Sequence, residues 1–167
     1  MSLVKGPFNF KWGANQVNNV SDISVDYTVD TSDTSTLDGN KFTVQTGMSA
    51  TVTLTLLDND IASLAVLLPQ YYVAQGEALS TGETVGNAAG AIDVVAASCT
   101  TSDVFNQLDV YACGTNAQVL RLVNCRTQIE SIDVSDGIRT VAVQFIGEPA
   151  SGEAVVQFLA DDETFVS

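Results

Sequence analysis

Alternation of apolar and polar residues is the strongest pattern in this chain, and it predicts β-strands. The clearest case is residues 22–30. Its apolar set is Ile23, Val25, Tyr27 and Val29, and its polar set is Asp22, Ser24, Asp26, Thr28 and Asp30. A period of two places the two sets on opposite faces, so we expect the apolar set to be buried and the polar set to face outward. A slip of one residue would bury three aspartates, which specifies the register.

Residues 49–57 alternate in the same way and are predicted to form the strand before the one predicted helix. The polar face of this strand carries Thr51, Thr53 and Thr55, and its apolar face carries alanine, valine and leucine. The alternation predicts a half-buried strand that shares a sheet with its neighbours.

The period then changes from two to 3.6 residues, which predicts a short α-helix. Apolar residues recur at i, i+3, i+4 and i+7 over residues 61–68, which makes one apolar face of roughly three turns. Asp58, Asn59 and Asp60 supply an N-cap and acidic first-turn residues that suit the helix dipole. Pro69 ends the helix, because the residue before a proline is pushed out of the helical region.

The remaining alternating or apolar stretches predict further strands. They cover residues 8–12, 41–46, 92–97, 104–112, 118–123, 129–134, 138–146 and 153–159. We expect one hairpin across Gly47, and a second across the Asp136–Gly137 pair. Nine or ten strands and one helix predict a mainly β fold, a β-sandwich or barrel with one short flanking α-helix. At 167 residues the chain fits a single domain over 1–167.

Two connections are longer than hairpins need. Residues 31–40 (TSDTSTLDGN) read as a polar loop with a turn signal at Asp38–Gly39. Residues 74–90 are rich in glycine, alanine and threonine and show little periodicity. Long loops are often functional, so we expect both to make contacts with a partner.

The composition is that of a folded but strongly acidic protein. Hydrophobic residues make up 46% of the chain, and 20 acidic residues against six basic ones give a formal net charge of −14. Such a charge repels phosphate groups and argues against specific binding to nucleic acid or to an anionic membrane. No apolar run has the length of a membrane helix, and the N-terminus lacks the apolar core of a signal peptide, so we expect no membrane anchor and synthesis in the cytoplasm.

The residue types of common active sites are missing or unpaired. The chain has no histidine, which excludes Ser–His and Cys–His nucleophilic schemes and removes the commonest metal ligand. Cys99, Cys113 and Cys125 match no zinc or redox spacing and are interpreted as small buried thiols, with a Cys99–Cys113 disulfide as the alternative. We therefore expect no catalytic residue, no cofactor and no metal site.

Two acidic clusters and one pair of tyrosines could in principle hold a ligand. Residues 58–60 could bind calcium, but helix capping explains them more simply, and residues 161–163 form a second acidic cluster. Carboxylates that could act together on a glycoside are not paired by any spacing. Tyr71 and Tyr72 follow Pro69, and we expect one ring to pack into the core and the other to face a partner subunit.

Several stretches together resemble the tail-tube (major tail) proteins of long-tailed bacteriophages. They are KGPFNFKWG, DISVDYTVDTSD, TVTLTLLDNDIASLAVLLPQYYV, RLVNCRT and TVAVQFIGEP, in this order along most of the chain. None is a specific fingerprint, because this family is identified by its architecture. The resemblance implies a sandwich with a flanking helix, six copies in a ring, and rings stacked into a hollow tube through which genomic DNA passes.

The resemblance also implies roles for residues and partners. Edge-to-edge joining of sheets would make the polar strand faces the lining of the lumen. The candidates are Asp22, Ser24, Asp26, Thr28, Asp30, Thr51, Thr53 and Thr55, with Thr140 and Gln144 as further positions. A long loop would reach the next ring, with Thr31, Asp33, Thr36, Leu37, Asp38 and Gly39 as its contact residues. The implied partners are further copies, the tape measure, the tail terminator and the tail tip or baseplate, in a virion assembled in the host cytoplasm.

Other interpretations of the sequence stay open. The polar faces could simply meet bulk water. A β-sandwich that binds a receptor or a carbohydrate is the main alternative function, and a capsid-decoration or tail-terminator protein is a third. A binding module should carry aromatic platforms or a calcium loop at one end of the sandwich.

Overall fold

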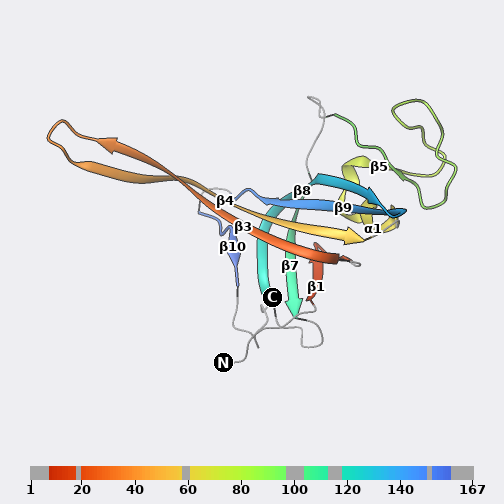
Figure 1. Cartoon of the computed structure of the whole chain (residues 1–167), viewed down its shortest axis with the longest axis horizontal. Coiled ribbons are helices and arrows are strands. Elements are labelled where there is room, and N and C mark those ends of the chain that lie inside the picture. Colours follow the sequence, from red (N-terminus) through yellow and green to blue (C-terminus); the bar gives the residue numbers. More distant parts are fainter. Residues whose placement is uncertain are drawn as a thin grey trace.

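A computed structural model describes residues 8–17, 20–57, 61–96, 104–112, 118–149 and 152–158. Its main feature is one antiparallel sheet of eight strands (Figure 1). Seven follow the order β2-β1-β7-β8-β9-β4-β3, and β10 pairs with β8. The strands are β1 (Phe8–Trp12), β2 (Asn15–Val17), β3 (Val20–Ser35), β4 (Lys41–Leu57), β7 (Phe105–Ala112), β8 (Gln118–Ser135), β9 (Ile138–Gly147) and β10 (Val156–Gln157).

The sheet folds over on itself at β8. The first part of β8 pairs with β7 as far as Arg126, and the second part pairs with β9 from Cys125 onward. In Figure 1, β7 therefore runs across the direction of β9, β4 and β3. The two halves face each other, and Trp12 of β1 meets Phe145 of β9 edge to face at 6.3 Å between ring centroids. The core lies between these halves, as in a sandwich.

The apolar residues of β4 and β9 face the core, and the polar residues that alternate with them lie on the opposite face, as predicted. Val52, Leu54 and Leu56 of β4 are buried against Val143 and Phe145 of β9. Burial on one face only is what the period of two predicts for a sheet with one solvated face. The mainly β fold with one α-helix is confirmed among the described residues.

The helix α1 (Ile61–Leu67) closes one side of the core. Leu64 and Leu68 are buried in it, as the 3.6 period predicts, and so is Leu67, which the predicted apolar face did not include. The Thr127 hydroxyl of β8 donates a hydrogen bond of 2.6 Å to the Leu67 carbonyl. The helix ends before Pro69, which begins the 3₁₀ turn η1 (Pro69–Tyr71). The predicted cap at residues 58–60 lies outside the described residues.

Four predicted boundaries differ from the structure. Residues 118–123 and 129–134 belong to one strand, β8, rather than two. Residues 41–57 are also one strand, so the expected hairpin across Gly47 is wrong; Gly47 pairs with Asp30 beside a register shift in the β3–β4 ladder. The expected strands over residues 92–97 and 153–159 shrink to β6 (Ala91–Ile92) and β10 among the described residues.

After η1 the chain forms a long irregular segment whose two ends lie close together. β5 (Tyr72–Val73) pairs with β6, which brings the two ends of residues 74–90 together. Asp93 accepts hydrogen bonds from the Ser80 backbone N–H at 2.7 Å and from the Ser80 hydroxyl at 3.2 Å. The predicted long connection is therefore present. The hydrogen bonds from Ser80 to Asp93 hold its middle against the residue that follows β6.

Candidate functional site

A polar face on β3 and β4 brings the predicted lumen residues together. The ladder between the strands pairs Asp22 with Thr55, Ser24 with Thr53, Asp26 with Thr51, Thr28 with Ser49 and Asp30 with Gly47. Directly paired residues point to the same side of a sheet. All eight residues predicted for the lumen therefore share one face.

This polar face continues across the sheet onto β9 and β8. Thr53 pairs with Gln144, and Gln144 pairs with Gln128, whose amide donates a hydrogen bond of 2.7 Å to the Gln144 side-chain oxygen. Arg126 lies beside Gln128 on this face and forms an ion pair of 2.9 Å with Glu148. The solvated face thus spans four strands, with aspartates near the β3 end and an arginine near the β8 end.

Both outer strands of this half-sheet present an open edge. β3 pairs only with β4, and β8 pairs with β7 no further than Arg126, so residues 127–135 have one strand partner, β9, among the described residues. Open edges of this length are normally blunted or covered in a stable protein. They are candidates for pairing with another chain.

The apolar face of β3 is not buried, which corrects the expectation from its alternation. Val25 is 47% exposed, Tyr27 is 57% exposed and Val29 is 40% exposed, whereas Ile23 packs partly against the core. The cause is position: β3 is the edge strand of the sheet, and opposite Val29 its partner β4 no longer pairs with β9. The side chains of Val25, Tyr27 and Val29 are therefore exposed on the surface of the chain.

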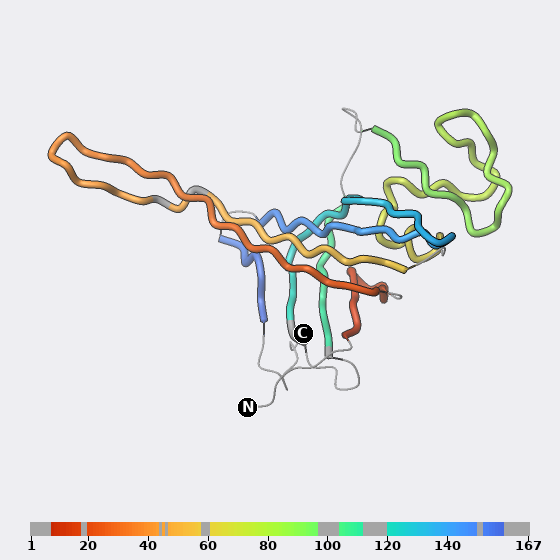
Figure 2. The backbone as a smooth tube through the Cα atoms, in the orientation of Figure 1, coloured from red at the N-terminus to blue at the C-terminus, as the bar shows by residue number. Residues whose placement is uncertain are grey.

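The expected polar loop is instead the end of a long β-hairpin. Residues 28–49 of β3 and β4 form an arm that projects beyond the rest of the sheet (Figure 2). Thr31 and Asp33 lie in β3, and only Thr36, Leu37, Asp38 and Gly39 lie in the connection. The prediction of a loop over residues 31–40 is therefore wrong in structure, because five residues suffice to turn the chain. A contact role for these residues stays a prediction.

Hydrogen bonds stiffen the arm. Asp33 accepts a hydrogen bond of 2.8 Å from the Thr43 hydroxyl and forms an ion pair of 3.1 Å with Lys41, and both lower the pKa of the Asp33 carboxyl below its ordinary value. The Thr36 hydroxyl donates to Asp38 and lowers the pKa of that carboxyl in the same way. Both aspartates are therefore charged over the whole neutral range.

Tyr71 and Tyr72 lie side by side in the chain but in different surroundings. Tyr71 is partly buried against the core, and Tyr72 is 38% exposed. The Tyr72 hydroxyl lies 3.4 Å from the Ala89 carbonyl, to which it donates, and its ring packs against Gly90, where a side chain would collide with it. Their role in a subunit contact stays a prediction.

Acidic side chains, a thiol and an α-helix lie among the residues that the structure describes. No group of three or more Cys, Asp or Glu residues is placed to hold a metal ion there. Cys125 is buried, which raises the pKa of its thiol to about 12, whereas Cys99 and Cys113 lie outside the described residues. In the described part of the chain, no helix has the length and hydrophobicity of a membrane span.

One feature was not predicted from the sequence: an apolar groove beside the root of the arm. It is formed by residues of β3 and β4 on one side and of β8 and the β10 segment on the other. The alternation of β3 signals the first set, but nothing in the sequence indicates that it lies opposite the second.

No protein-family model and no curated protein sequence matches this chain. Its fold does match solved structures. A chain in the structure of an extracellular contractile injection system, the PVC sheath/tube terminator in the extended state, superposes with a TM-score of 0.50 at 12% identity, covering 93% of this chain and 99% of that one. The fold is of the tail-tube type.

Two further matches have the same character. The sheath–tube complex of the same injection system gives a TM-score of 0.49 at 12% identity over 91% of this chain and 88% of that one. The tube-terminating cap of the anti-feeding prophage gives 0.49 at 12% identity over 95% and 96%. At such identities the likeness concerns the fold alone.

Proposed function

We propose that this chain is a structural subunit of a virion tail tube, in which copies join edge to edge into rings and the rings stack into a hollow tube. The observation that carries the proposal is the half-sheet β3-β4-β9-β8, with a polar face and two open edges. The four strands alternate in direction, so β3 and β8 run antiparallel to each other. In copies related by rotation, β3 of one and β8 of the next are then oriented for an antiparallel ladder.

The dimensions suit a DNA conduit. Six copies with four strands each would give 24 strands, and a spacing of about 4.8 Å with a tilt of about 40° gives a backbone diameter of roughly 48 Å. Polar side chains would narrow this opening, which would still pass a DNA duplex. The number six rests on the resemblance to tail-tube proteins.

The charge of the lining would keep DNA moving. Asp22 and Asp26 would face the lumen in every copy, together with threonines and glutamines, and the positive charge of Arg126 on the same face is offset by its ion pair with Glu148. Repulsion of phosphate groups prevents the counterion-release binding that positive surfaces produce. The proposed role is structural rather than catalytic, and its partners are further copies and the other tail components, in the virion after assembly in the host cytoplasm.

Electron microscopy of the purified protein tests this proposal. Negative stain at high protein concentration and about 0.15 M salt, where surface charges are screened beyond about 8 Å, should show rings or tubes with a central hole. Light scattering on the same sample should give the mass of a ring or of larger assemblies. Monomers throughout the concentration and salt range would contradict the proposal and favour the binding-module alternative.

A further inference from the structure

A second groove lies at the β8 edge of the half-sheet, between α1 and the β8–β9 hairpin, and we call it the helix groove (Figure 1). It has a volume of about 130 Å³ and is lined by apolar residues of α1, β8 and β9, with Ile92 and Val94. Arg139 of β9 is the one charged residue among the described residues of this lining. Ile132 of β8, beside the open edge, is 55% exposed, so apolar surface remains uncovered there.

Two buried polar atoms flank the same open edge without a hydrogen-bond partner among the described residues. They are Arg139 Nε and Gln70 Oε1. The Gln70 amide donates a hydrogen bond of 3.1 Å to the carbonyl of Thr127, where the open edge begins, and Arg139 pairs with Val134 near its other end. A buried polar group without a partner carries an uncompensated desolvation cost, which is why such groups are rare. A chain that covers this edge and brings an oxygen to Arg139 and an N–H group to Gln70 would satisfy both.

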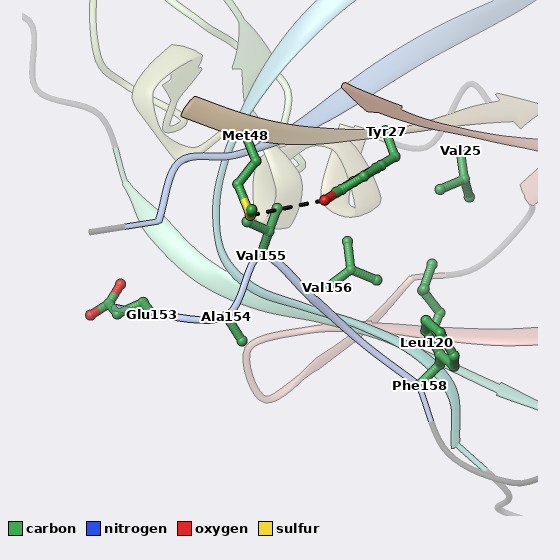
Figure 3. Close-up of a pocket in the computed structure, with 9 residues that line it drawn as sticks. All are labelled: Val25, Tyr27, Met48, Leu120, Glu153, Ala154, Val155, Val156 and Phe158. Carbon is green, nitrogen blue, oxygen red and sulfur yellow. Dashed lines mark hydrogen bonds between the residues drawn. The ribbon is translucent and has the colours of Figure 1, made fainter. Parts of the chain in front are cut away.

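The other open edge carries a side chain that suits the helix groove. Tyr27 of β3 is 57% exposed, and its hydroxyl donates only to the weakly accepting sulfur of Met48, at 3.9 Å (Figure 3). Its oxygen can still accept a hydrogen bond. Tyr27 lies on the core side of the half-sheet, as α1 does, whereas Asp26 and Asp133 lie on the polar face. A tyrosine combines an apolar ring with a polar hydroxyl, which matches an apolar groove that contains one arginine.

The geometry of a closed ring brings Tyr27 to the helix groove. The ladders of one copy set Tyr27 level with Cys125 of β8. A strand tilt of about 40° displaces adjacent copies along their strands by about 16 Å over four strands, or about five residues. In one direction this displacement would put β3 beside residues of β8 that already pair with β7. In the other direction Tyr27 comes level with residues 129–131, beside the groove.

We infer that Tyr27 of one copy inserts into the helix groove of the next copy in the ring. Its ring packs against Ile129 and Ile132, and its hydroxyl accepts a hydrogen bond from Arg139 Nε. A backbone N–H of the same β3 edge donates to Gln70 Oε1. The inference rests on the proposed function, since it names the side chain and the groove that join two copies at the ring junction.

Photo-crosslinking tests this contact directly. Replacement of Tyr27 by the photoreactive aromatic residue p-benzoylphenylalanine keeps a ring at the position. Irradiation should give covalent oligomers on a denaturing gel, with peptide mapping that places the bond in α1 or in residues 129–141 of a second copy. The matched control replaces Phe42, which is also 57% exposed but lies on the arm outside the half-sheet, and it should not crosslink to the helix groove.

The outcomes separate this contact from the proposed tube. Crosslinks to the helix groove from position 27 alone support the contact. Rings by microscopy with position 27 crosslinked elsewhere or not at all, or equal groove crosslinks from position 42, overturn the contact and leave the tube standing. Groove crosslinks from a sample without rings or tubes would instead retain the contact and contradict the tube.

Substitutions of Tyr27 give a second, quantitative measurement by sedimentation. Tyr27→Ala should raise the concentration needed for ring formation about 10- to 100-fold, the effect of losing one buried aromatic side chain. Tyr27→Phe should raise it about 2- to 10-fold, because Arg139 Nε loses its acceptor, and this effect should vanish in the Arg139→Met background. Assembly of Tyr27→Ala at the wild-type concentration would contradict the insertion, and an unchanged Tyr27→Phe effect in the Arg139→Met background would contradict the hydrogen bond.

Discussion

Removing two aspartates from the polar face should abolish much of the salt dependence of ring formation. The perturbation is the double variant Asp22→Asn/Asp26→Asn. Both residues lie opposite threonines of β4 that also pair with β9, so they belong to the four-stranded half-sheet, whereas Asp30 lies beyond it. In a ring joined edge to edge, equivalent aspartates of adjacent copies would be about 19 Å apart, and Asp22 would lie about 13 Å from Asp26 along β3.

These distances determine the size of the effect. Four aspartate pairs would cross each junction, and Coulomb repulsion in water, screened over about 30 Å at 0.01 M salt, gives about 0.1 kcal/mol for each pair. Six junctions then add about 2.4 kcal/mol of repulsion, which falls to about 0.4 kcal/mol at 0.15 M, where screening acts over about 8 Å. The variant should therefore form rings roughly 60-fold more favourably than the wild-type chain at low salt and only about 2-fold more favourably at 0.15 M.

Sedimentation velocity over a salt series from 0.01 to 0.15 M measures the assembled fraction of each chain. The control Glu77→Gln/Glu83→Gln removes two exposed charges from residues 74–90, outside the polar face, and should follow the wild-type salt curve more closely. The reasoning fails if the aspartate variant retains the wild-type salt dependence. It also fails if the control loses as much of that dependence, because net charge rather than the shared lumen would then control assembly.

Three predictions concern stability and reactivity. Phe145→Ala removes a fully buried ring that packs against Trp12, and it should lower the free energy of unfolding in urea by about 3–5 kcal/mol. Thr127→Val leaves the Leu67 carbonyl without its buried hydroxyl donor and should cost about 1–3 kcal/mol in a thermal melt; an unchanged melt would contradict the helix anchor. Cys125, whose pKa is raised from 9.0 to about 12 by burial, should resist iodoacetamide at pH 8 until the chain unfolds, and its stabilising contribution should be lost as the pH rises from 9 toward 12.

Features controlled by neighbouring residues were predictable from the sequence. The helix ends at Pro69 because a proline ring clashes with the preceding residue, and no distant contact is needed for this effect. The turn at Asp136–Gly137 forms as predicted, with positive φ angles of 53° and 76°, which this pair tolerates in a hairpin. The faces of β4 and β9 were predictable for the same reason, since a strand's alternation depends only on its own geometry.

Features that depend on distant residues were not predictable. Residues 31–35 (TSDTS) are polar on both faces, so they lack the alternation that signals a strand, although they pair with residues 41–45 along the arm. The bend of the sheet at Cys125 has no local signature, because it results from β7 and β9 pairing with different parts of one strand. The sequence therefore suggested a loop where the structure has an arm, and two strands where it has one.

The sequence alone determined which side chains share a face, the acidic and histidine-free composition, and the positions of the helix and the tight turns. These properties follow from backbone geometry and residue chemistry within short stretches. The tertiary structure decided which faces are covered and which edges stay open. Alternation on β3 predicts an apolar face, but only the tertiary structure shows that Val25 and Tyr27 on this face are exposed. Burial depends on segments far apart in the chain, so the edges and the groove emerge only when the sheet folds over on itself.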